Sequence, residues 1–233
     1  VSPDQYNDEI NRMNRLALFD CDGTLVDSQY SIVASMQRAF AEAGLPLPEA
    51  AAVRAIVGLR LDEAISRLLP SRSADAIAGL CDSYRRAYVA VHKDPDQQDA
   101  LYEGVPDMLA QFEEQGWVLG VATGKSRSGL LGALKRFNLR SRFVTLKTAD
   151  DGPGKPDPFI VREAVAEAGA AAETCVVIGD TSFDMLMARN AGTGSIGVSW
   201  GYHPAEELSR CGAQYIARTV AELPILAAQV LKD

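Results

Sequence analysis

The sequence predicts an α/β protein with a doubly wound parallel sheet, into which a block of helices is inserted. Three observations predict this class. Short, continuously apolar runs recur along the chain, as expected for strands that are buried on both faces. Amphipathic stretches with helical spacing separate most of these runs, which is typical of right-handed β-α-β units. One stretch of roughly 70 residues shows helical spacing only, and it is too long to be a loop.

Five apolar runs are the expected strands. Each is short, and each is followed by residues that favour turns or helix starts. The run around residue 143 is the weakest of the set. In chain order the expected strands are Leu16–Phe19, Val118–Ala122, Phe143–Leu146, Cys175–Ile178 and Ser195–Val198.

Three helices are expected between the later strands. Their apolar residues recur at i, i+3, i+4 and i+7, and proline in a first turn or glycine after a last turn marks their ends. The expected helices run from Val105 to Gly116, from Asp157 to about Gly169, and from Asp184 to Ala191.

The helical block is expected over residues 29–98, as a small subdomain inserted after the first strand. Helical spacing places the following apolar residues, two tyrosines among them, on inward faces: Ile32, Met36, Phe40, Ala43, Leu61, Ile65, Leu68, Leu69, Ile77, Leu80, Tyr84 and Tyr88. The polar stretch 92–99, with Pro95, is expected to return the chain. The α/β core would then comprise residues 13–28 and 99–233. Residues 1–12 are interpreted as an upstream extension or an expression remnant.

Composition excludes several classes of protein. The chain has 233 residues, 47% of them apolar and 23% charged, which is ordinary for a globular protein of one or two domains. No apolar stretch approaches the roughly 18 residues of a membrane-spanning helix, so no membrane partner is expected. The net charge of −8 argues against nucleic acid, whose phosphates an acidic surface repels. Four cysteines without metal-binding spacing indicate reduced thiols and a cytoplasmic location.

Chemically active residues follow the expected strands, at the edge of the sheet where open α/β proteins bind ligands. They are Asp20, Asp22, Thr123, Lys155, Asp180 and Asp184. Clustered carboxylates repel one another unless a cation lies among them, and Mg²⁺ is the first choice for oxygen ligands. Such a cation, a lysine, a threonine hydroxyl and helix-start N–H groups together form a receptacle for a phosphoryl group. A carboxylate beside them permits attack at phosphorus through an aspartyl phosphate.

Four motifs carry a family resemblance. They are DCDGT after the first strand, Thr123 after the second, Lys155 in GKPDP, and GDTSFD after the fourth. In this order they resemble the motifs of the haloacid dehalogenase-like hydrolase superfamily, from about Leu16 onward. The segments FDCDGTLVDS and SWGYHPAEEL are also similar to phosphoglycolate-phosphatase-type members. The resemblance implies a Rossmann-like core with an α-helical cap domain. It also implies a phosphatase for a small phosphorylated metabolite, with phosphoglycolate favoured.

The resemblance implies roles for the acidic residues. Asp20 would be the nucleophile that forms the aspartyl phosphate. Asp22 would protonate the leaving alkoxide and then activate water. Mg²⁺ would be bound by Asp180, by the Asp20 carboxylate and by the main-chain carbonyl of Asp22. Asp184 would hold Lys155 or a metal-bound water.

The resemblance also implies a phosphate pocket. Thr123 and the Gly124 N–H would bind phosphoryl oxygens, and Lys155 would pair with Asp20 and the phosphate. Relatives of this type often carry asparagine at the position of Gly124. Phosphate contact at that position would therefore rest on the backbone, or Lys125 would contribute.

Other polar residues leave alternatives open. Arg54 and Arg60, in the helical block, would either bind a substrate carboxylate or solvate a helix end. His92 is expected to face solvent, and His203 to lie near the edge of the site without a catalytic role. Ser28 is expected to cap the first helix of the block.

Two further functions remain open on the sequence. A sugar phosphomutase would use the same aspartyl phosphate but return the phosphoryl group to the substrate. A non-catalytic regulator would bind phosphate without turnover. The oligomeric state is expected to be a monomer or a homodimer.

Overall fold

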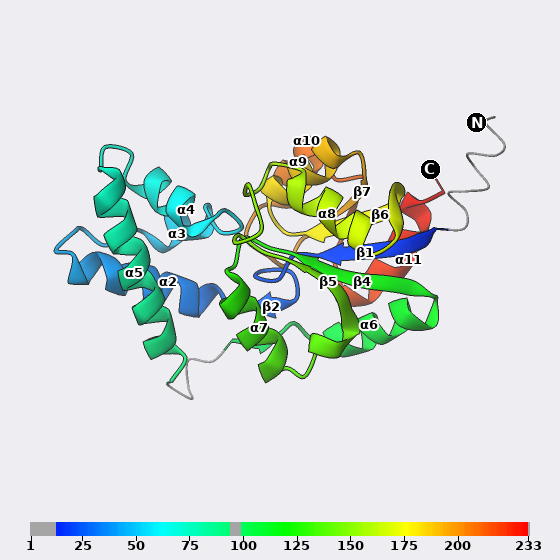
Figure 1. Cartoon of the computed structure of the whole chain (residues 1–233), viewed down its shortest axis with the longest axis horizontal. Helices are drawn as coiled ribbons and strands as arrows, with labels where there is room; N and C mark the ends of the chain where they lie inside the picture. Colours follow the sequence, from blue (N-terminus) through cyan, green and yellow to red (C-terminus); the bar gives the residue numbers. More distant parts are fainter. Residues whose placement is uncertain (1–12, 94–98, 233) are drawn as a thin grey trace.

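The computed structural model describes residues 13–93 and 99–232 (Figure 1). Six strands form one parallel sheet in the order β5-β4-β1-β6-β7-β8, which confirms the predicted fold class. The five predicted strands are all present. The strands are β1 (Asn14–Phe19), β4 (Trp117–Ala122), β5 (Phe143–Lys147), β6 (Ala170–Gly179), β7 (Gly194–Val198) and β8 (Tyr215–Ala217).

Strand β1 lies at the centre of the sheet and is buried on both faces. It pairs with β4 on one side and β6 on the other. Because side chains alternate along a strand, Ala17 and Phe19 join one apolar cluster while Leu16 and Leu18 join another. The four residues are fully buried. This double burial explains why the run is continuously apolar rather than alternating.

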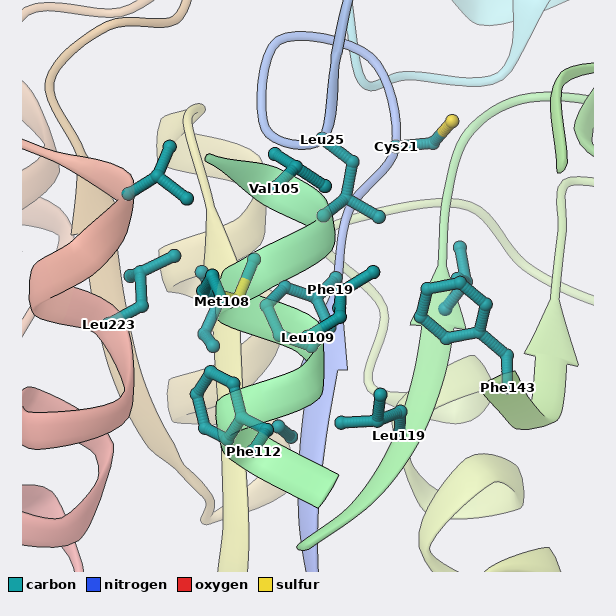
Figure 2. Packing of buried hydrophobic residues seen from close by; sticks show 14 of the residues in the cluster. Phe19, Cys21, Leu25, Val105, Met108, Leu109, Phe112, Leu119, Phe143 and Leu223 are labelled. Carbon is teal, nitrogen blue, oxygen red and sulfur yellow. The ribbon is translucent and has the colours of Figure 1, made fainter. Parts of the chain in front are cut away.

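Helices cover both faces of the sheet. Helices α6 (Val105–Glu114), α7 (Arg127–Arg136) and α11 (Leu223–Val230) contribute to the cluster of Phe19. Figure 2 shows α6 lying along β1 and β4, with Met108, Leu109 and Phe112 turned toward the strands. Helices α8 (Phe159–Glu167) and α9 (Ser182–Ala191) contribute to the cluster of Leu18. Helix α10 (Ala205–Cys211) lies beside α9, and two short 3-10 turns, Arg140–Arg142 and Val220–Glu222, complete the core.

The segment between β1 and α6 carries four helices, which we call the helical insertion. They are α2 (Gln29–Glu42), α3 (Ala50–Arg54), α4 (Leu61–Leu68) and α5 (Ala74–Val91). These helices pack around a separate apolar cluster that includes Met36, Ile65 and Leu80, and Phe183 of α9 joins it. Two short strands, β2 (Val26–Asp27) and β3 (Ala100–Leu101), pair antiparallel where the chain leaves and re-enters the core.

The sequence located the elements that carry strong patterns and missed the weaker ones. The three predicted helices correspond to α6, α8 and α9. Helices α7, α10 and α11 and strands β2, β3 and β8 were not predicted; the three strands are only two or three residues long, too short for a periodic signal. Residues 1–12 and most of the 92–99 stretch lie outside the described residues.

No helix within residues 13–93 or 99–232 combines the length and the hydropathy needed to cross a bilayer.

Replacing Phe112 with alanine tests the core under α6. Phe112 is fully buried and makes edge-on contacts with Phe19 and Trp117, at ring-centroid distances of 5.6 and 5.4 Å. We expect Phe112→Ala to lower the free energy of unfolding by about 3–5 kcal/mol, because the neighbouring side chains cannot fill the cavity that the missing ring leaves. Ile225→Ala, at a helical position that is 64% exposed, should change it by about 0.5 kcal/mol or less. Urea denaturation measures the free energy of unfolding of each variant. Equal losses in the two variants would contradict the burial of Phe112 in the core.

Candidate active site

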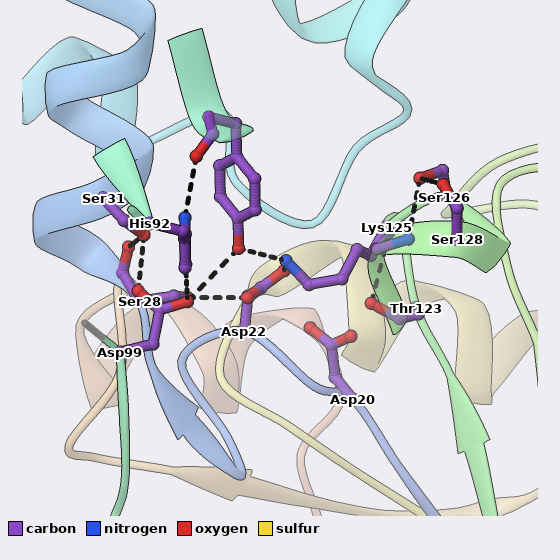
Figure 3. Close-up of polar contacts among 12 residues, drawn as sticks. Asp20, Asp22, Ser28, Ser31, His92, Asp99, Thr123, Lys125, Ser126 and Ser128 are labelled. Atoms are coloured by element: carbon purple, nitrogen blue, oxygen red, sulfur yellow. Dashed lines mark hydrogen bonds and ion pairs between the residues drawn. The ribbon is translucent and has the colours of Figure 1, made fainter. Parts of the chain in front are cut away.

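The carboxyl ends of β1, β4 and β6 bring the predicted residues to one edge of the sheet. Asp20 and Asp22 follow β1, Thr123 follows β4, and Asp180 follows β6. Asp184 lies in the first turn of α9, and Lys155 comes from the loop between β5 and α8. All six of these residues are buried. Figure 3 shows Asp20, Asp22 and Thr123 side by side at this edge.

Lys155 lies between two carboxylates. Its Nζ is 2.9 Å from Asp20 Oδ1 and 2.6 Å from Asp184 Oδ1. The other oxygen of Asp184 accepts hydrogen bonds from the Thr181 main-chain N–H and hydroxyl, in a capping box that opens α9. Burial alone would lower the pKa of Lys155, but Asp184 and Asp20 outweigh burial and raise it. Lys155 is therefore a permanent cation beside Asp20.

Asp180 is held on two sides by loops. Its carboxylate accepts hydrogen bonds from the Thr24 hydroxyl and the Tyr202 main-chain N–H, both at 2.9 Å. Gly23 lets the first loop approach this closely, because it adopts a φ of +84° and a Cβ there would lie 2.1 Å from Asp180 Oδ2. The loop after β1 thus requires glycine both for its conformation and for the space that Asp180 occupies.

Three of the carboxylates form a pocket suited to a divalent cation. Asp20, Asp180 and Asp184 each offer an oxygen, and these oxygens lie within 4.8 Å of one another. Asp20 Oδ2 has no hydrogen-bond partner among the described residues, although it is buried. Burial is the main cause that raises the pKa of Asp20 to about 6 against the effect of Lys155, and burial, Asp20 and Asp184 raise the pKa of Asp180 well above its usual range. A bound cation would relieve this repulsion, so the donor set fits a hard metal ion.

Asp22 is oriented by a partner on each oxygen. The Ser28 hydroxyl donates to Oδ1 at 2.6 Å, and Lys125 Nζ lies 2.9 Å from Oδ2. Burial alone would lower the pKa of Lys125, yet Asp22 and other neighbours raise it. Figure 3 shows the ammonium group of Lys125 directed at Asp22. The sequence had proposed Lys125 only as a possible phosphate contact.

Thr123 and Gly124 lie where the helical insertion meets the core. The buried Thr123 hydroxyl accepts a hydrogen bond from the Lys125 main-chain N–H at 3.3 Å. A Cβ at position 124 would lie 2.4 Å from the carbonyl oxygen of Gly58 and 2.7 Å from that of Leu59. The insertion therefore packs directly on Gly124, which explains why no side chain stands there.

A cavity of about 930 Å³ opens from these residues into the space under the insertion. Asp20, Asp22, Thr123 and Lys125 line its core side. Apolar and aromatic side chains line the opposite side: Ile32, Met36, Val57, Leu59, Tyr84 and Tyr88. The nucleophile expected from the sequence is thus accessible from a cavity that the core and the insertion enclose together.

Comparison with known proteins agrees with this geometry. Residues 17–198 match the family described as haloacid dehalogenase-like hydrolase. The chain belongs to that family. It is 34% identical to the probable phosphatase IndB of Dickeya dadantii over 226 residues, covering 94% of this chain and 96% of the relative. A phosphoglycolate phosphatase of Xanthomonas campestris pv. campestris is 31% identical, with 84% and 88% covered. A predicted phosphatase from Clostridium acetobutylicum has the same fold, with a TM-score of 0.83, 24% identity, and 93% and 99% covered.

Some expectations for individual residues of this haloacid dehalogenase-like hydrolase were wrong. His92 does not face solvent: its side chain is 10% exposed, and Nε2 lies 2.8 Å from Asp99 Oδ2. Ser28 precedes α2 but makes no side-chain capping bond, since its hydroxyl donates to Asp22. Tyr88 packs against the apolar cluster of the insertion, as expected, but its hydroxyl also accepts a hydrogen bond from Lys125 at 3.1 Å, which was not expected.

Two more of the residues left open, Arg60 and His203, contact other parts of the protein. Arg60 Nη1 donates to the main-chain carbonyls of Ala149 and Gly152, at 2.9 and 3.0 Å, and so fastens the insertion to the core. Substrate binding by Arg60 stays a prediction. His203 is buried, and its Nδ1 accepts from the Ser182 N–H at the start of α9. It is not among the residues that line the cavity, and the absence of a catalytic role for His203 stays a prediction.

The carboxylate pocket predicts a pH-dependent response to Mg²⁺. Because the pKa values of Asp20 and Asp180 are raised by folding, the metal-free protein should lose stability as pH rises from about 4 to 6 and beyond. Saturating Mg²⁺ should therefore raise the Tm by about 5 °C or more near pH 8, and by less near pH 5.

Differential scanning fluorimetry with and without Mg²⁺ measures this response. Asp180→Asn should abolish it, whereas Asp107→Asn, at an exposed position of α6, should retain it. An undiminished shift in Asp180→Asn would show that Mg²⁺ binds elsewhere.

Proposed function

We propose that this protein is a Mg²⁺-dependent phosphatase that hydrolyses a small phosphate monoester through an aspartyl phosphate on Asp20. The observation that supports this most is the setting of Asp20. One of its oxygens is paired with Lys155, the other has no partner within the described structure, and the residue lines the cavity. A buried carboxylate with one oxygen held by a cation and one left unpaired is suited to act as a nucleophile.

The first half-reaction transfers the phosphoryl group to the protein. An Asp20 oxygen forms a bond to phosphorus while the bond from phosphorus to the ester oxygen breaks. Asp22 donates a proton to the departing alkoxide, so that a neutral alcohol leaves. Lys155 and Thr123, with the Gly124 N–H, stabilise the charge on the phosphoryl oxygens.

The second half-reaction restores Asp20. Asp22, now a carboxylate, accepts a proton from a water molecule as that water attacks phosphorus. The bond between phosphorus and Asp20 breaks, and inorganic phosphate leaves. Asp22 thus acts first as an acid and then as a base, which leaves it protonated for the next cycle.

Mg²⁺ would be bound by the Asp20 and Asp180 carboxylates and the main-chain carbonyl of Asp22. When bound, it supplies positive charge beside the phosphoryl group and offsets the carboxylate repulsion. We assign Asp184 a supporting role, because both of its oxygens are engaged, by Lys155 and by Thr181.

The helical insertion, with boundaries at residues 29 and 98, would act as a cap domain over the substrate. It contributes one side of the cavity, and a cap of this kind excludes bulk water and selects the leaving group. Phosphoglycolate is the favoured substrate on the resemblance and on the name of one relative. The cavity of about 930 Å³ also leaves room for larger esters. We place the enzyme in the cytoplasm, as a monomer or homodimer.

A panel of phosphate monoesters tests the proposed function. It should contain phosphoglycolate, sugar phosphates, nucleoside monophosphates, benzyl phosphate and 4-nitrophenyl phosphate, with inorganic phosphate release as the readout. Asp20→Asn should lower turnover by at least about 10³-fold, because the amide cannot form the acyl phosphate. EDTA should have a comparable effect, and Asp107→Asn should stay within about twofold of wild type.

The same panel separates the alternatives. Phosphoryl transfer to a sugar phosphate, without phosphate release, would favour a phosphomutase. Binding of phosphate by a folded, Mg²⁺-loaded protein that turns over no ester would favour a non-catalytic regulator.

A further inference from the structure

A closed ring of polar contacts surrounds Asp22, and the proposed chemistry does not use most of it. In order around the ring, its members are Asp22, Lys125, Tyr88, Asp99, Ser31 and Ser28. Figure 3 shows Lys125 on one side of Asp22, and Asp99, Ser31 and Ser28 on the other side. The ring joins the catalytic loop, the loop after β4, and helices α2 and α5.

Within this ring, Lys125 connects the core with the helical insertion. It belongs to the core loop after β4, and its Nζ contacts Asp22 Oδ2 at 2.9 Å and the Tyr88 hydroxyl at 3.1 Å. Its ammonium group also lies 4.9 Å from the centre of the Tyr88 ring, in a cation–π contact. Its side chain is only 10% exposed, so these contacts face little competition from water. A long, flexible lysine chain is thereby confined to one position.

Tyr88 is in turn held in place by Asp99. Its hydroxyl donates to Asp99 Oδ2 at 3.2 Å, and His92 Nε2 lies 2.8 Å from the same oxygen. The other oxygen of Asp99 accepts from the Ser31 hydroxyl at 2.6 Å. Tyr88 can therefore hold Lys125 only while α5 is packed against the loop after β4.

Asp22 needs this support because general acid catalysis depends on geometry. A proton donor acts only within hydrogen-bond distance of the leaving oxygen, and a carboxyl group can rotate away from it. Ser28 fixes one oxygen of Asp22, and Lys125 fixes the other. Removing either partner would leave the carboxyl group free to rotate.

We propose that Lys125 is a positioning residue for Asp22, and that Tyr88 of the helical insertion holds Lys125 in place for this role. The proposal rests on the proposed function, because it assigns Lys125 to the protonation of the leaving group. Lys125 acts through Asp22 and does not itself transfer a proton or bind the reacting atoms.

The dependence of kcat/KM on the leaving group distinguishes this role from a structural one. Benzyl phosphate and 4-nitrophenyl phosphate carry rings of the same size, but only the benzyl alkoxide needs a proton to depart. The ratio kcat/KM reports the steps up to release of the alcohol, where Asp22 acts as an acid. Lys125→Met should lower kcat/KM for benzyl phosphate by about 100-fold and for 4-nitrophenyl phosphate by less than about 5-fold.

Two further variants complete the experiment. Tyr88→Phe removes only a hydroxyl and should reduce kcat/KM for benzyl phosphate by about 3- to 10-fold, with a smaller effect on the nitrophenyl ester. It also keeps the proposal testable if Lys125→Met does not fold. Lys147→Met removes another half-buried lysine, which pairs with Glu167 at 2.9 Å and is not in the ring, and it should leave the ratio between the two esters unchanged.

Equal losses for the two esters in Lys125→Met and Tyr88→Phe, or no loss in either variant, would overturn the proposal. If the wild-type protein releases phosphate from neither ester and from nothing in the panel, the proposed function itself fails, and the inference fails with it.

Discussion

The structure depends on how it accommodates buried negative charge at the end of β1. Ligand oxygens of Asp20, Asp180 and Asp184 lie within 4.8 Å of one another, the three side chains are almost fully buried, and burial raises the pKa values of Asp20 and Asp180. Lys155 neutralises part of this charge through Asp20 and Asp184. The Mg²⁺ ion that we propose for this site would offset the remaining excess. Isolated buried carboxylates would be costly, so their clustering here fits a cation-binding site.

The parallel sheet holds these residues together on rigid strands. The strands on either side of β1 end at the same edge, so that residues far apart in the sequence meet there on rigid supports. The helical insertion makes further contacts with this edge of the core. Gly58 and Leu59 lie on Gly124, Arg60 binds carbonyls of the core, and Tyr88 contacts Lys125. The insertion is therefore connected to the reaction centre by direct contacts as well as by the two chain crossings.

The sequence predicted the central part of this account well, for physical reasons. Strands buried on both faces leave continuous apolar runs, and residues that follow such strands, such as Asp20 and Asp180, can be assigned to the carboxyl edge without coordinates. The sequence could not predict contacts made by tertiary packing. The contact between Lys125 and Asp22 joins segments far apart in the sequence, and the bonds from Ser28 to Asp22 and from His92 to Asp99 lie in irregular turns that no periodic pattern encodes. Ser28 was misjudged because a serine before a helix usually caps that helix.

The central claim is that Asp20 carries the phosphoryl group during turnover. The most direct measurement is acid quenching of the wild-type protein during turnover of a radiolabelled ester, followed by peptide mapping of the trapped label. The account predicts an acid-stable, hydroxylamine-sensitive phosphoryl group on the peptide that contains Asp20, and none in Asp20→Asn. A label on another residue, or phosphate release with no trapped intermediate and undiminished activity in Asp20→Asn, would contradict it.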